Sequence, residues 1–225
     1  MRIAYLITTF NRSEACHRLI NQLYGKGDIF LINDGSRGYS WVRNYDIHYH
    51  KNRHNLGKAG FYKTVSTLWS MAGFDYDFYF NIQDDYLPVR DFEKKAISTW
   101  GQIRDPKKMC LNILVDKSRT HRANWTKIPP VDLGEYRRIG WVDMHFMAQR
   151  GFFEYFGCRI PDPYIDYKLK PTMSSGVGRH ISTKLHKAGY TMYQTKTSLL
   201  IPQPEACDSQ MNGWRKDQRI NEVIL

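Results

Sequence analysis

Short apolar runs alternate with amphipathic segments through the first 90 residues, and this alternation limits the folds open to the chain. Continuous or alternating apolar runs predict strands, and apolar residues at three- and four-residue intervals predict helices. The expected order is strand, helix, strand, strand, helix and strand, at residues 2–10, 11–25, 28–34, 46–52, 59–73 and 77–83. Such an order with short links favours an open sheet. We therefore expect one α/β domain with a mostly parallel central sheet and flanking helices.

Beyond residue 90 the pattern is less regular. It predicts a helix, a strand, a basic loop, a strand, two helices and a strand, at residues 91–103, 109–116, 116–138, 141–149, 150–157, 174–189 and 190–202. No run approaches the roughly 20 apolar residues that a membrane-spanning helix needs, and the first residues lack a signal-peptide pattern. The four cysteines are scattered without a C-x-x-C, which is typical of reduced thiols and favours a cytoplasmic location.

Polar clusters follow three of the expected strands, at residues 8–12, 33–36 and 83–85. In open α/β sheets, ligands bind outside the carboxyl ends of the strands. We therefore expect the three clusters to form one pocket.

Two adjacent carboxylates, Asp84 and Asp85, end the strand expected at residues 77–83. Like charges this close raise each other's pKa and need a compensating cation or hydrogen-bond donors. Oxygen ligands of this kind suit Mn²⁺ or Mg²⁺ when phosphates complete the coordination. The alternative is that the pair caps the helix expected to begin at Asp91.

Two glycine-containing turns add candidates for ligand binding. Asp34 could accept a hydrogen bond from a base or a ribose, with Gly35 allowing a ligand close to the backbone, or it could form an ordinary Asx turn. Gly57 and Lys58 precede a predicted helix, whose N-terminus could bind a phosphate, or they form an ordinary turn.

The motifs TTFNR, NDGS, NLGKAG and QDD, in this order and spacing, resemble the nucleotide-binding half of the family 2-like glycosyltransferases of the GT-A fold. The resemblance covers roughly residues 3–90 and is loose beyond them. It implies a single Rossmann-like GT-A domain. Within it, residues 1–90 would form the nucleotide-sugar-binding half and residues 91–225 the acceptor-binding half.

The resemblance also implies roles for individual residues. Asp85 would bind Mn²⁺ or Mg²⁺ on the diphosphate of the donor. The nucleotide sugar would contact Thr9, Asn11, Arg12, Asp34, Gly57, Lys58 and Asp84.

Two features depart from the pattern of this family. The usual acidic pair ahead of the late helix is absent, because residues 174–179 read Ser-Ser-Gly-Val-Gly-Arg. Asp143 and Asp166 are therefore the candidates for the catalytic base, with a structural role as the alternative for Asp143. Near the C-terminus, Glu205 and Asp208 stand where family members often have a metal-binding His, and they are candidate metal ligands.

Basic residues outnumber acidic ones by 33 to 22, which gives a net charge of +11. A positive net charge of this size favours binding to polyanionic partners. The segment at residues 117–127 interleaves basic and aromatic side chains without an acid, as DNA-binding segments do, and its candidates are Lys117, Arg119, Arg122, Trp125 and Lys127. A solvated basic surface, or one that binds anionic lipid headgroups, is the alternative.

Together these features predict a hexosyl- or pentosyltransferase that uses a nucleotide sugar, expected to be a UDP-sugar. The favoured acceptor is a hydroxymethylated pyrimidine in DNA, as in phage enzymes that modify DNA. The first alternative is a transferase of cell-surface polysaccharide or lipopolysaccharide synthesis. The second is an inactive relative that only binds DNA or a sugar nucleotide. No protein partner is evident.

Overall fold

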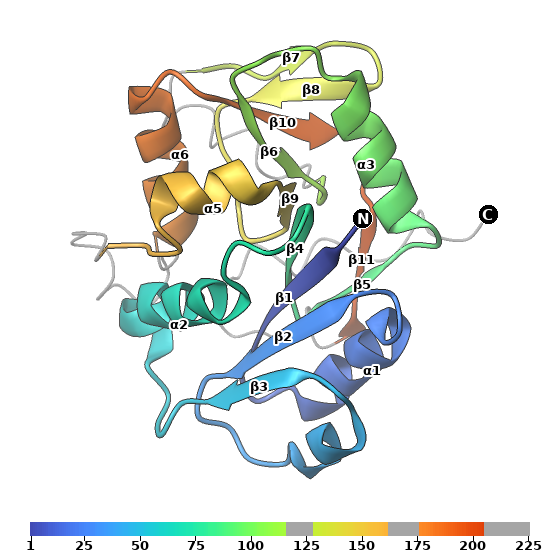
Figure 1. Cartoon of the computed structure of the whole chain (residues 1–225), viewed down its shortest axis with the longest axis vertical. Coiled ribbons are helices and arrows are strands. Elements are labelled where there is room, and N and C mark those ends of the chain that lie inside the picture. Colours follow the sequence, from blue (N-terminus) through green and yellow to red (C-terminus); the bar gives the residue numbers. More distant parts are fainter. Residues whose placement is uncertain (116–127, 162–175, 205–225) are drawn as a thin grey trace.

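A nine-stranded sheet organises the chain (Figure 1). The structure is a computed structural model, and it describes residues 1–115, 128–161 and 176–204. Taken across the sheet, the strands are β3 (His48–Lys51), β2 (Asp28–Asn33), β1 (Ile3–Thr9), β4 (Phe78–Gln83), β9 (Phe146–Ala148), β6 (Lys108–Asn112), β10 (Thr191–Thr195), β8 (Tyr136–Ile139) and β7 (Val131–Asp132).

Parallel pairing dominates the half of the sheet built by the first 90 residues. β3, β2, β1 and β4 pair in parallel, β9 is antiparallel to both β4 and β6, and β10 is parallel to β6. β8 is antiparallel to β10 and to β7. Only β9 and β8 therefore oppose β1, so seven of the nine strands run in one direction, and the expected mostly parallel α/β sheet is confirmed.

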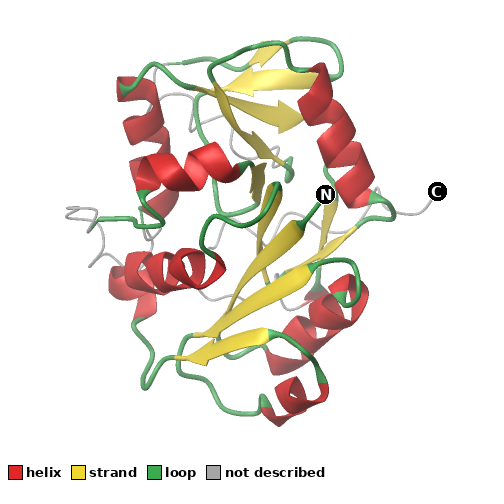
Figure 2. Cartoon of the chain, in the orientation of Figure 1, coloured by secondary structure: helices red, strands yellow, loops and turns green. Residues whose placement is uncertain are grey.

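Helices cover both faces of the sheet (Figure 2). The described helices are α1 (Ser13–Leu23), the 3-10 helix η1 (Ser40–Asn44), α2 (Gly57–Ala72), α3 (Phe92–Gln102), α5 (Arg150–Phe156) and α6 (Val177–Lys187). Alternate residues of β1 point to opposite faces, as the period of a strand requires. Tyr5 and Ile7 join the core under α1 and α3, and Ala4 and Leu6 join the core under α2, α5 and α6.

A second, two-stranded sheet joins distant parts of the chain. β5 (Tyr86–Pro88) directly follows Asp84 and Asp85, and it pairs antiparallel with β11 (Leu200–Pro202). The strand expected at residues 190–202 is therefore wrong as one element. It breaks after Thr195, where the Thr195 hydroxyl bonds the carbonyl of Thr197 and the chain turns toward β5.

Two other expectations in the second half are corrected. The loop expected at residues 116–138 contains β7 and the start of β8, because an Asx turn from Asp132 to the N–H of Gly134 reverses the chain. The strand expected at residues 141–149 shortens to β9. The N–H of Val142 bonds the Ser182 hydroxyl instead of a neighbouring strand.

The helix expected at residues 59–73 starts earlier, at Gly57. Three cysteines of the described residues, Cys16, Cys110 and Cys158, are buried free thiols, as expected. Among the described helices none combines the length and apolarity needed to cross a membrane.

Candidate active site

The three polar clusters meet at the carboxyl edge of the sheet. β1 lies between β2 and β4, with Thr9 paired to Asn33 and Thr8 paired to Gln83. Backbone hydrogen bonds continue past the strands, from the N–H of Asp34 to the carbonyl of Thr9 at 2.9 Å. The expected convergence of these clusters is therefore confirmed.

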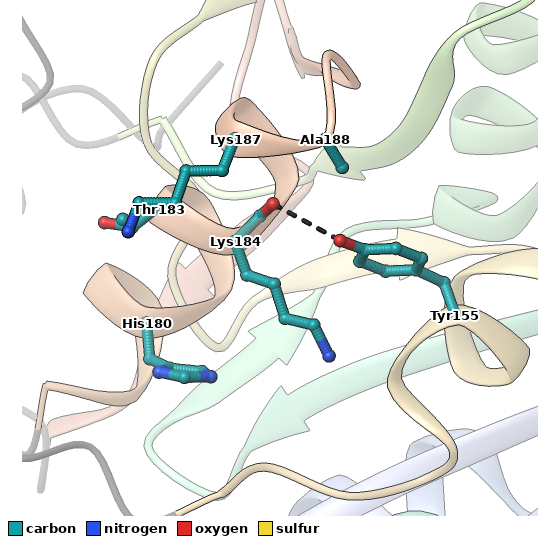
Figure 3. Close-up of a pocket in the computed structure, with 6 residues that line it drawn as sticks. All are labelled: Tyr155, His180, Thr183, Lys184, Lys187 and Ala188. Carbon is teal, nitrogen blue, oxygen red and sulfur yellow. Dashed lines mark hydrogen bonds between the residues drawn. The ribbon is translucent and has the colours of Figure 1, made fainter.

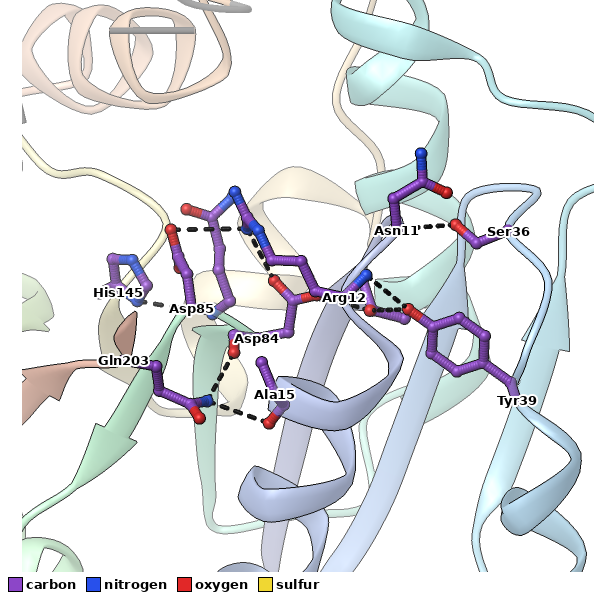
Figure 4. A network of polar contacts seen from close by, with 11 residues as sticks. Asn11, Arg12, Ala15, Ser36, Tyr39, Asp84, Asp85, His145 and Gln203 are labelled. Atoms are coloured by element: carbon purple, nitrogen blue, oxygen red, sulfur yellow. Dashed lines mark hydrogen bonds and ion pairs between the residues drawn. The ribbon is translucent and has the colours of Figure 1, made fainter. Parts of the chain in front are cut away.

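Arg12 compensates the adjacent carboxylates (Figure 4). Asp84 and Asp85 are each only 2% exposed. The Arg12 Nη1 atom lies 3.0 Å from Asp84 Oδ1 and 3.6 Å from Asp85 Oδ2. The hydroxyl of Thr9 donates to Asp84 Oδ2 at 2.6 Å. One guanidinium from the loop between β1 and α1 therefore contacts both acids.

Burial shifts the pKa of the Asp84 carboxyl toward neutral pH. It raises the pKa of this carboxyl to about 7, with the negative charge of Asp85 adding to the rise. Arg12 and the Thr9 hydroxyl oppose the rise because they stabilise the ionised form. A second cation beside Asp84 would favour the carboxylate further.

Tyr39, which the sequence did not single out, extends this network. Its hydroxyl lies 2.6 Å from Thr9 Oγ1 and accepts the backbone N–H of Arg12 at 3.3 Å. Since the Thr9 proton is donated to Asp84, the Tyr39 hydroxyl donates to Thr9. Burial raises the pKa of Tyr39. The order of donors therefore fixes the Thr9 hydroxyl toward the carboxylate.

Gln203, the residue after β11, holds the backbone of the acidic pair from the other side (Figure 4). Its backbone N–H donates to the carbonyl of Asp85 at 2.8 Å, and its side-chain amide donates to the carbonyl of Asp84 at 2.7 Å. The same amide also donates to the carbonyl of Ala15, and its oxygen accepts from Arg18. Gln203 is 2% exposed, so these bonds form in a nearly dry environment.

Asp34 ties the end of β2 to the start of α2. Its Oδ1 atom accepts hydrogen bonds from Asn52 Nδ2 at 2.7 Å and from the N–H of Leu56 at 3.1 Å. A Cβ atom on Gly35 would lie 2.5 Å from the backbone of His54 and Asn55. Glycine is therefore required at this position because the chain itself fills the space of a side chain, and a ligand beside the Gly35 backbone stays a prediction.

Asn11, Gly57 and Lys58 border the same edge. Asn11 has a φ of 55°, and its backbone N–H donates to the hydroxyl of Ser36 at 2.7 Å. Gly57 opens α2 with its N–H bonded to Asn55 Oδ1, one residue after the Leu56 N–H that binds Asp34. Lys58 is half-buried, which lowers the pKa of its amine. Gly57 and Lys58 therefore follow directly after the residue whose N–H binds Asp34, and Asn11 contacts the turn that follows β2.

A cavity of about 360 Å³ lies beside this edge. It begins at Ser36 and Tyr39, next to the network of Thr9, and it reaches Lys51 at the end of β3. Arg37 and Arg43 also line it. This space follows the carboxyl ends of β2 and β3 and has a basic lining.

The segment before β9 brings Asp143 and His145 to the same edge. β9 is antiparallel to β4, so the residues that precede β9 lie beyond the carboxyl end of β4. Asp143 is half-buried and accepts the N–H of Met144 at 2.8 Å. His145, only 1% exposed, contacts the ring of Tyr86 and accepts the N–H of Gln83 at 3.5 Å.

Sequence reasoning missed His145, although it lies two residues after Asp143 and directly before the strand. Figure 4 shows its ring beside Asp85. Several predicted site residues fall outside the described residues, namely Asp166, Glu205, Asp208, Lys117, Arg119, Arg122, Trp125 and Lys127.

The acidic pair fits a divalent cation by its chemistry. Carboxylate oxygens are hard ligands, and Mg²⁺ or Mn²⁺ sites commonly use one or two carboxylates with phosphate oxygens from the substrate. Within residues 1–115, 128–161 and 176–204, no cluster of three or more His, Cys, Asp or Glu side chains could hold a metal alone. A cation at Asp84 and Asp85 would therefore take further oxygens from a bound ligand.

No family model and no curated protein matches the sequence. Among solved structures, the mannosyltransferase PcManGT from Pyrobaculum calidifontis, in complex with GDP-Man and Mn²⁺, has a TM-score of 0.59 at 16% identity. That match covers 88% of this chain and 55% of the mannosyltransferase. S. aureus TarS 1-349 has a TM-score of 0.59 at 11% identity, over 90% of this chain and 60% of TarS.

GalNAc-T7 with UDP, GalNAc and Mn²⁺ has a TM-score of 0.58 at 13% identity, over 87% of this chain and 42% of its own. At these identities the likeness shows the fold, which is the GT-A fold expected from the sequence. The chain spans 60% or less of the length of each of these solved chains.

Proposed function

We propose that this chain is a metal-dependent glycosyltransferase that moves a sugar from a nucleotide sugar to a hydroxyl group. The observation that carries the proposal is the buried pair Asp84 and Asp85 at the carboxyl end of β4, in a sheet with the GT-A fold. The mannosyltransferase and GalNAc-T7 structures each contain Mn²⁺ with a nucleotide or nucleotide sugar, which supports a divalent metal and a nucleoside diphosphate here.

The donor site is assigned to the edge formed by β2, β1 and β4. The nucleoside would occupy the 360 Å³ cavity beside Ser36 and Tyr39. The cavity is lined by other residues, among them Ser36, Tyr39 and Lys51. The rest of the nucleotide sugar would contact the residues expected from the sequence, which are Thr9, Asn11, Arg12, Asp34, Gly57, Lys58 and Asp84. Asp85, beside the diphosphate, would be the principal metal ligand. A bound Mn²⁺ or Mg²⁺ stabilises the negative charge that develops on the leaving diphosphate.

Sugar transfer needs a base as well as a leaving group. The acceptor oxygen forms a bond to the anomeric carbon, the bond from that carbon to the phosphate oxygen breaks, and the hydroxyl proton must be removed. Asp143 is the proposed base because it is half-buried at the same edge as Asp85. His145 would position the site by its contacts with Tyr86 and Gln83.

The proposed acceptor is a hydroxymethylated pyrimidine in DNA. Support comes from the net charge of +11 and from the basic, aromatic segment at residues 117–127. A transferase that builds surface glycans, or an inactive binding protein, would share the fold but not this acceptor.

The test combines donor turnover with acceptor analysis. The protein would be incubated with Mn²⁺, UDP- and GDP-sugars, and DNA that contains 5-hydroxymethylcytosine or 5-hydroxymethyluracil. We expect release of nucleoside diphosphate and a sugar-sized mass gain on the modified nucleoside. Asp85→Asn should lose both, because the amide cannot provide the charge that binds the metal.

Asp91→Asn is the matched control for this experiment. It makes the same chemical change at an exposed carboxylate, and Asn tolerates the positive φ of 57° found there. It should turn over donor as wild type does. Absence of nucleoside diphosphate release with every donor and acceptor would refute the proposal. Donor turnover without a mass gain on either modified base would support a glycosyltransferase and exclude the DNA acceptor.

A further inference from the structure

A basic groove lies between α5 and α6 (Figure 3), and neither Asp84 nor Asp85 lines it. Its cavity has a volume of about 390 Å³, and its lining residues are Tyr155, His180, Thr183, Lys184, Lys187 and Ala188. The lining includes two lysines and a histidine but no acid. α6 as a whole carries five basic side chains and no acidic one. The groove is therefore a concave surface that offers hydrogen-bond donors and positive charge.

Lys184 is held in place by aromatic rings. Its Nζ atom lies 4.9 Å from the centre of the Tyr155 ring and 4.7 Å from that of Phe156. The Tyr155 hydroxyl donates to the backbone carbonyl of Lys184 at 3.4 Å (Figure 3). Ring faces orient an ammonium group without neutralising its charge. Lys184 therefore keeps a net positive charge available at the groove.

His180 contributes a second donor. Its Nε2 atom is buried and finds no hydrogen-bond partner among the described residues. Burial and the nearby charge of Lys184 lower the pKa of His180, so a neutral imidazole with one N–H is favoured. Buried polar atoms in proteins are nearly always paired. With the proton on Nε2, this atom would donate a hydrogen bond to an anionic ligand in the groove.

The helix dipole accounts for only part of this arrangement. Lys184, His186 and Lys187 lie in the last turn of α6, where cations interact favourably with the carbonyl end of a helix. His186 additionally bonds the carbonyl of Gly140. Neither interaction explains the cavity or the position of His180, which lies in the first turns of α6.

The helix that lines the groove also contacts the segment of the proposed base. The hydroxyl of Ser182 accepts the N–H of Val142 at 2.9 Å, and a Cβ on Gly178 would lie 3.4 Å from the Cα atom of Asp143. α6 thus packs directly on the segment that carries Asp143. Gly178 and Ser182, which do not line the groove, therefore connect the helix of the groove to the segment of Asp143.

We propose that this groove binds neighbouring backbone phosphates of the DNA acceptor, through Lys184, Lys187 and His180. This assignment rests on the proposed function and names the part of the chain that holds the acceptor. Compact ammonium groups suit phosphates, which dominate the affinity of proteins for DNA.

A membrane surface is the less suitable partner for this groove. Docking on lipid pairs basic residues with exposed apolar ones on the same face. The large hydrophobic side chains that are exposed among the described residues are Met1, Phe10, Tyr24, Phe74 and Leu133, and none of them lies on α5 or α6.

The test is the salt dependence of DNA binding. Affinity for a fluorescein-labelled 20-mer duplex would be measured by anisotropy across salt concentrations, for wild type, Lys187→Gln and the double variant Lys184→Gln/Lys187→Gln. Each lost phosphate contact should reduce the slope of log affinity against log salt by about one. We expect a reduction of about one for the single variant and about two for the double variant.

A second measurement leaves Lys184 in place, so its contacts with the rings of Tyr155 and Phe156 are kept. Inorganic phosphate would be titrated while the ring signals of His180 are followed by NMR, with His180→Gln used for assignment. Saturable shifts are expected in wild type and not in Lys187→Gln, whose side chain is not among those stacked on Tyr155 or Phe156.

Lys63→Gln is the matched control, because it removes a lysine that also lies over a tyrosine ring, Tyr62 of α2, at 5.8 Å. It should leave the slope unchanged. The proposed phosphate site would be refuted if wild type and the double variant had equal slopes. It would also be refuted if Lys63→Gln reduced the slope as much as the double variant does. Donor turnover is measured separately. Donor turnover together with equal slopes would refute only the phosphate site in the groove. A reduced slope in the double variant without donor turnover would refute the proposed function and retain the groove as a phosphate site.

Discussion

Asp84 and Asp85 show how a single residue, Arg12, makes an unfavourable pair tolerable. Two buried carboxylates repel each other, and desolvation penalises both charges. Arg12 contacts both, and Thr9 donates to Asp84. Even so, the pKa of Asp84 stays near 7. The pair is therefore incompletely neutralised by the protein, as expected of side chains that also meet a metal ion.

This poise predicts a pH dependence of stability in metal-free protein. The pKa of Asp84 is raised from 3.8 when unfolded to about 7 when folded, so the folded state binds its proton more tightly. The resulting stability is complete below pH 4 and is lost as the pH rises through 7. Between pH 5 and pH 8, the free energy of unfolding of wild type should fall by about 2 to 3 kcal/mol more than that of Asp84→Asn, whose amide does not titrate.

Urea unfolding in EDTA at the two pH values measures this difference. An equal change for both proteins would contradict the raised pKa. Added Mn²⁺ should reduce the loss in wild type, because the metal binds the ionised form.

At the level of elements, the small sheet of β5 and β11 positions the acidic pair. β5 starts at the residue after Asp85, and β11 ends at the residue before Gln203. Gln203 then bonds the carbonyls of both acids. β11, from the end of the described chain, thereby fixes the direction in which the chain leaves β4 at Asp84 and Asp85.

Gln203→Ala tests this positioning role. The substitution removes the side-chain bonds to Asp84 and Ala15, and a buried carbonyl left unpaired costs roughly 1–3 kcal/mol. We expect a dissociation constant for Mn²⁺ raised about ten-fold, corresponding to about 1.4 kcal/mol. Isothermal titration with Mn²⁺ and UDP measures this value without relying on turnover.

Gln22→Ala provides the control for Gln203→Ala. Gln22 also donates a side-chain hydrogen bond to the β5 backbone, at the carbonyl of Pro88, at the end of the strand away from the acids. Its loss should lower stability and leave Mn²⁺ binding unchanged. If both variants bind Mn²⁺ as wild type does, Gln203 has only a structural role.

At the scale of the whole molecule, Trp69 connects the two halves of the chain. It lies on α2, and its ring contacts Phe152, Phe153 and Phe156 of α5 at centroid distances of 5.2 to 5.9 Å. Its indole N–H donates to Asn81 of β4 at 3.0 Å. The core under this face thus contains side chains from both sides of residue 90, as does the sheet.

Trp69→Ala should therefore weaken both halves together. Removing a fully buried aromatic side chain typically costs about 3–5 kcal/mol. We expect one unfolding transition at lower urea concentration, with far-UV circular dichroism and the fluorescence of the remaining tryptophans changing together. Two separate transitions would show that residues 1–90 and 91–225 fold as independent units.

Trp41→Ala should have a smaller effect, because Trp41 is only half-buried and packs beside α1. This control separates the loss of any tryptophan from the loss of the one that joins the halves.

The sequence by itself determined the elements of the first 90 residues and the polar residues that follow them. Apolar periodicity is a local property, so β1, α1, β2, β3, α2 and β4 could be predicted, and parallel strands necessarily place Thr9, Asp34 and Asp84 at one edge. In the second half, local patterns predicted β7, β8 and β11 poorly, because these strands are short and pair antiparallel with strands from other parts of the chain.

Only the tertiary structure decided what compensates the acidic pair. Arg12 is 72 residues from Asp84, Gln203 is 119 residues from it, and His145 is 62 residues from Gln83. Such contacts depend on the order of strands in the sheet and on which face each strand presents. No local pattern carries that information, because the free energy that fixes the order comes from packing the whole core.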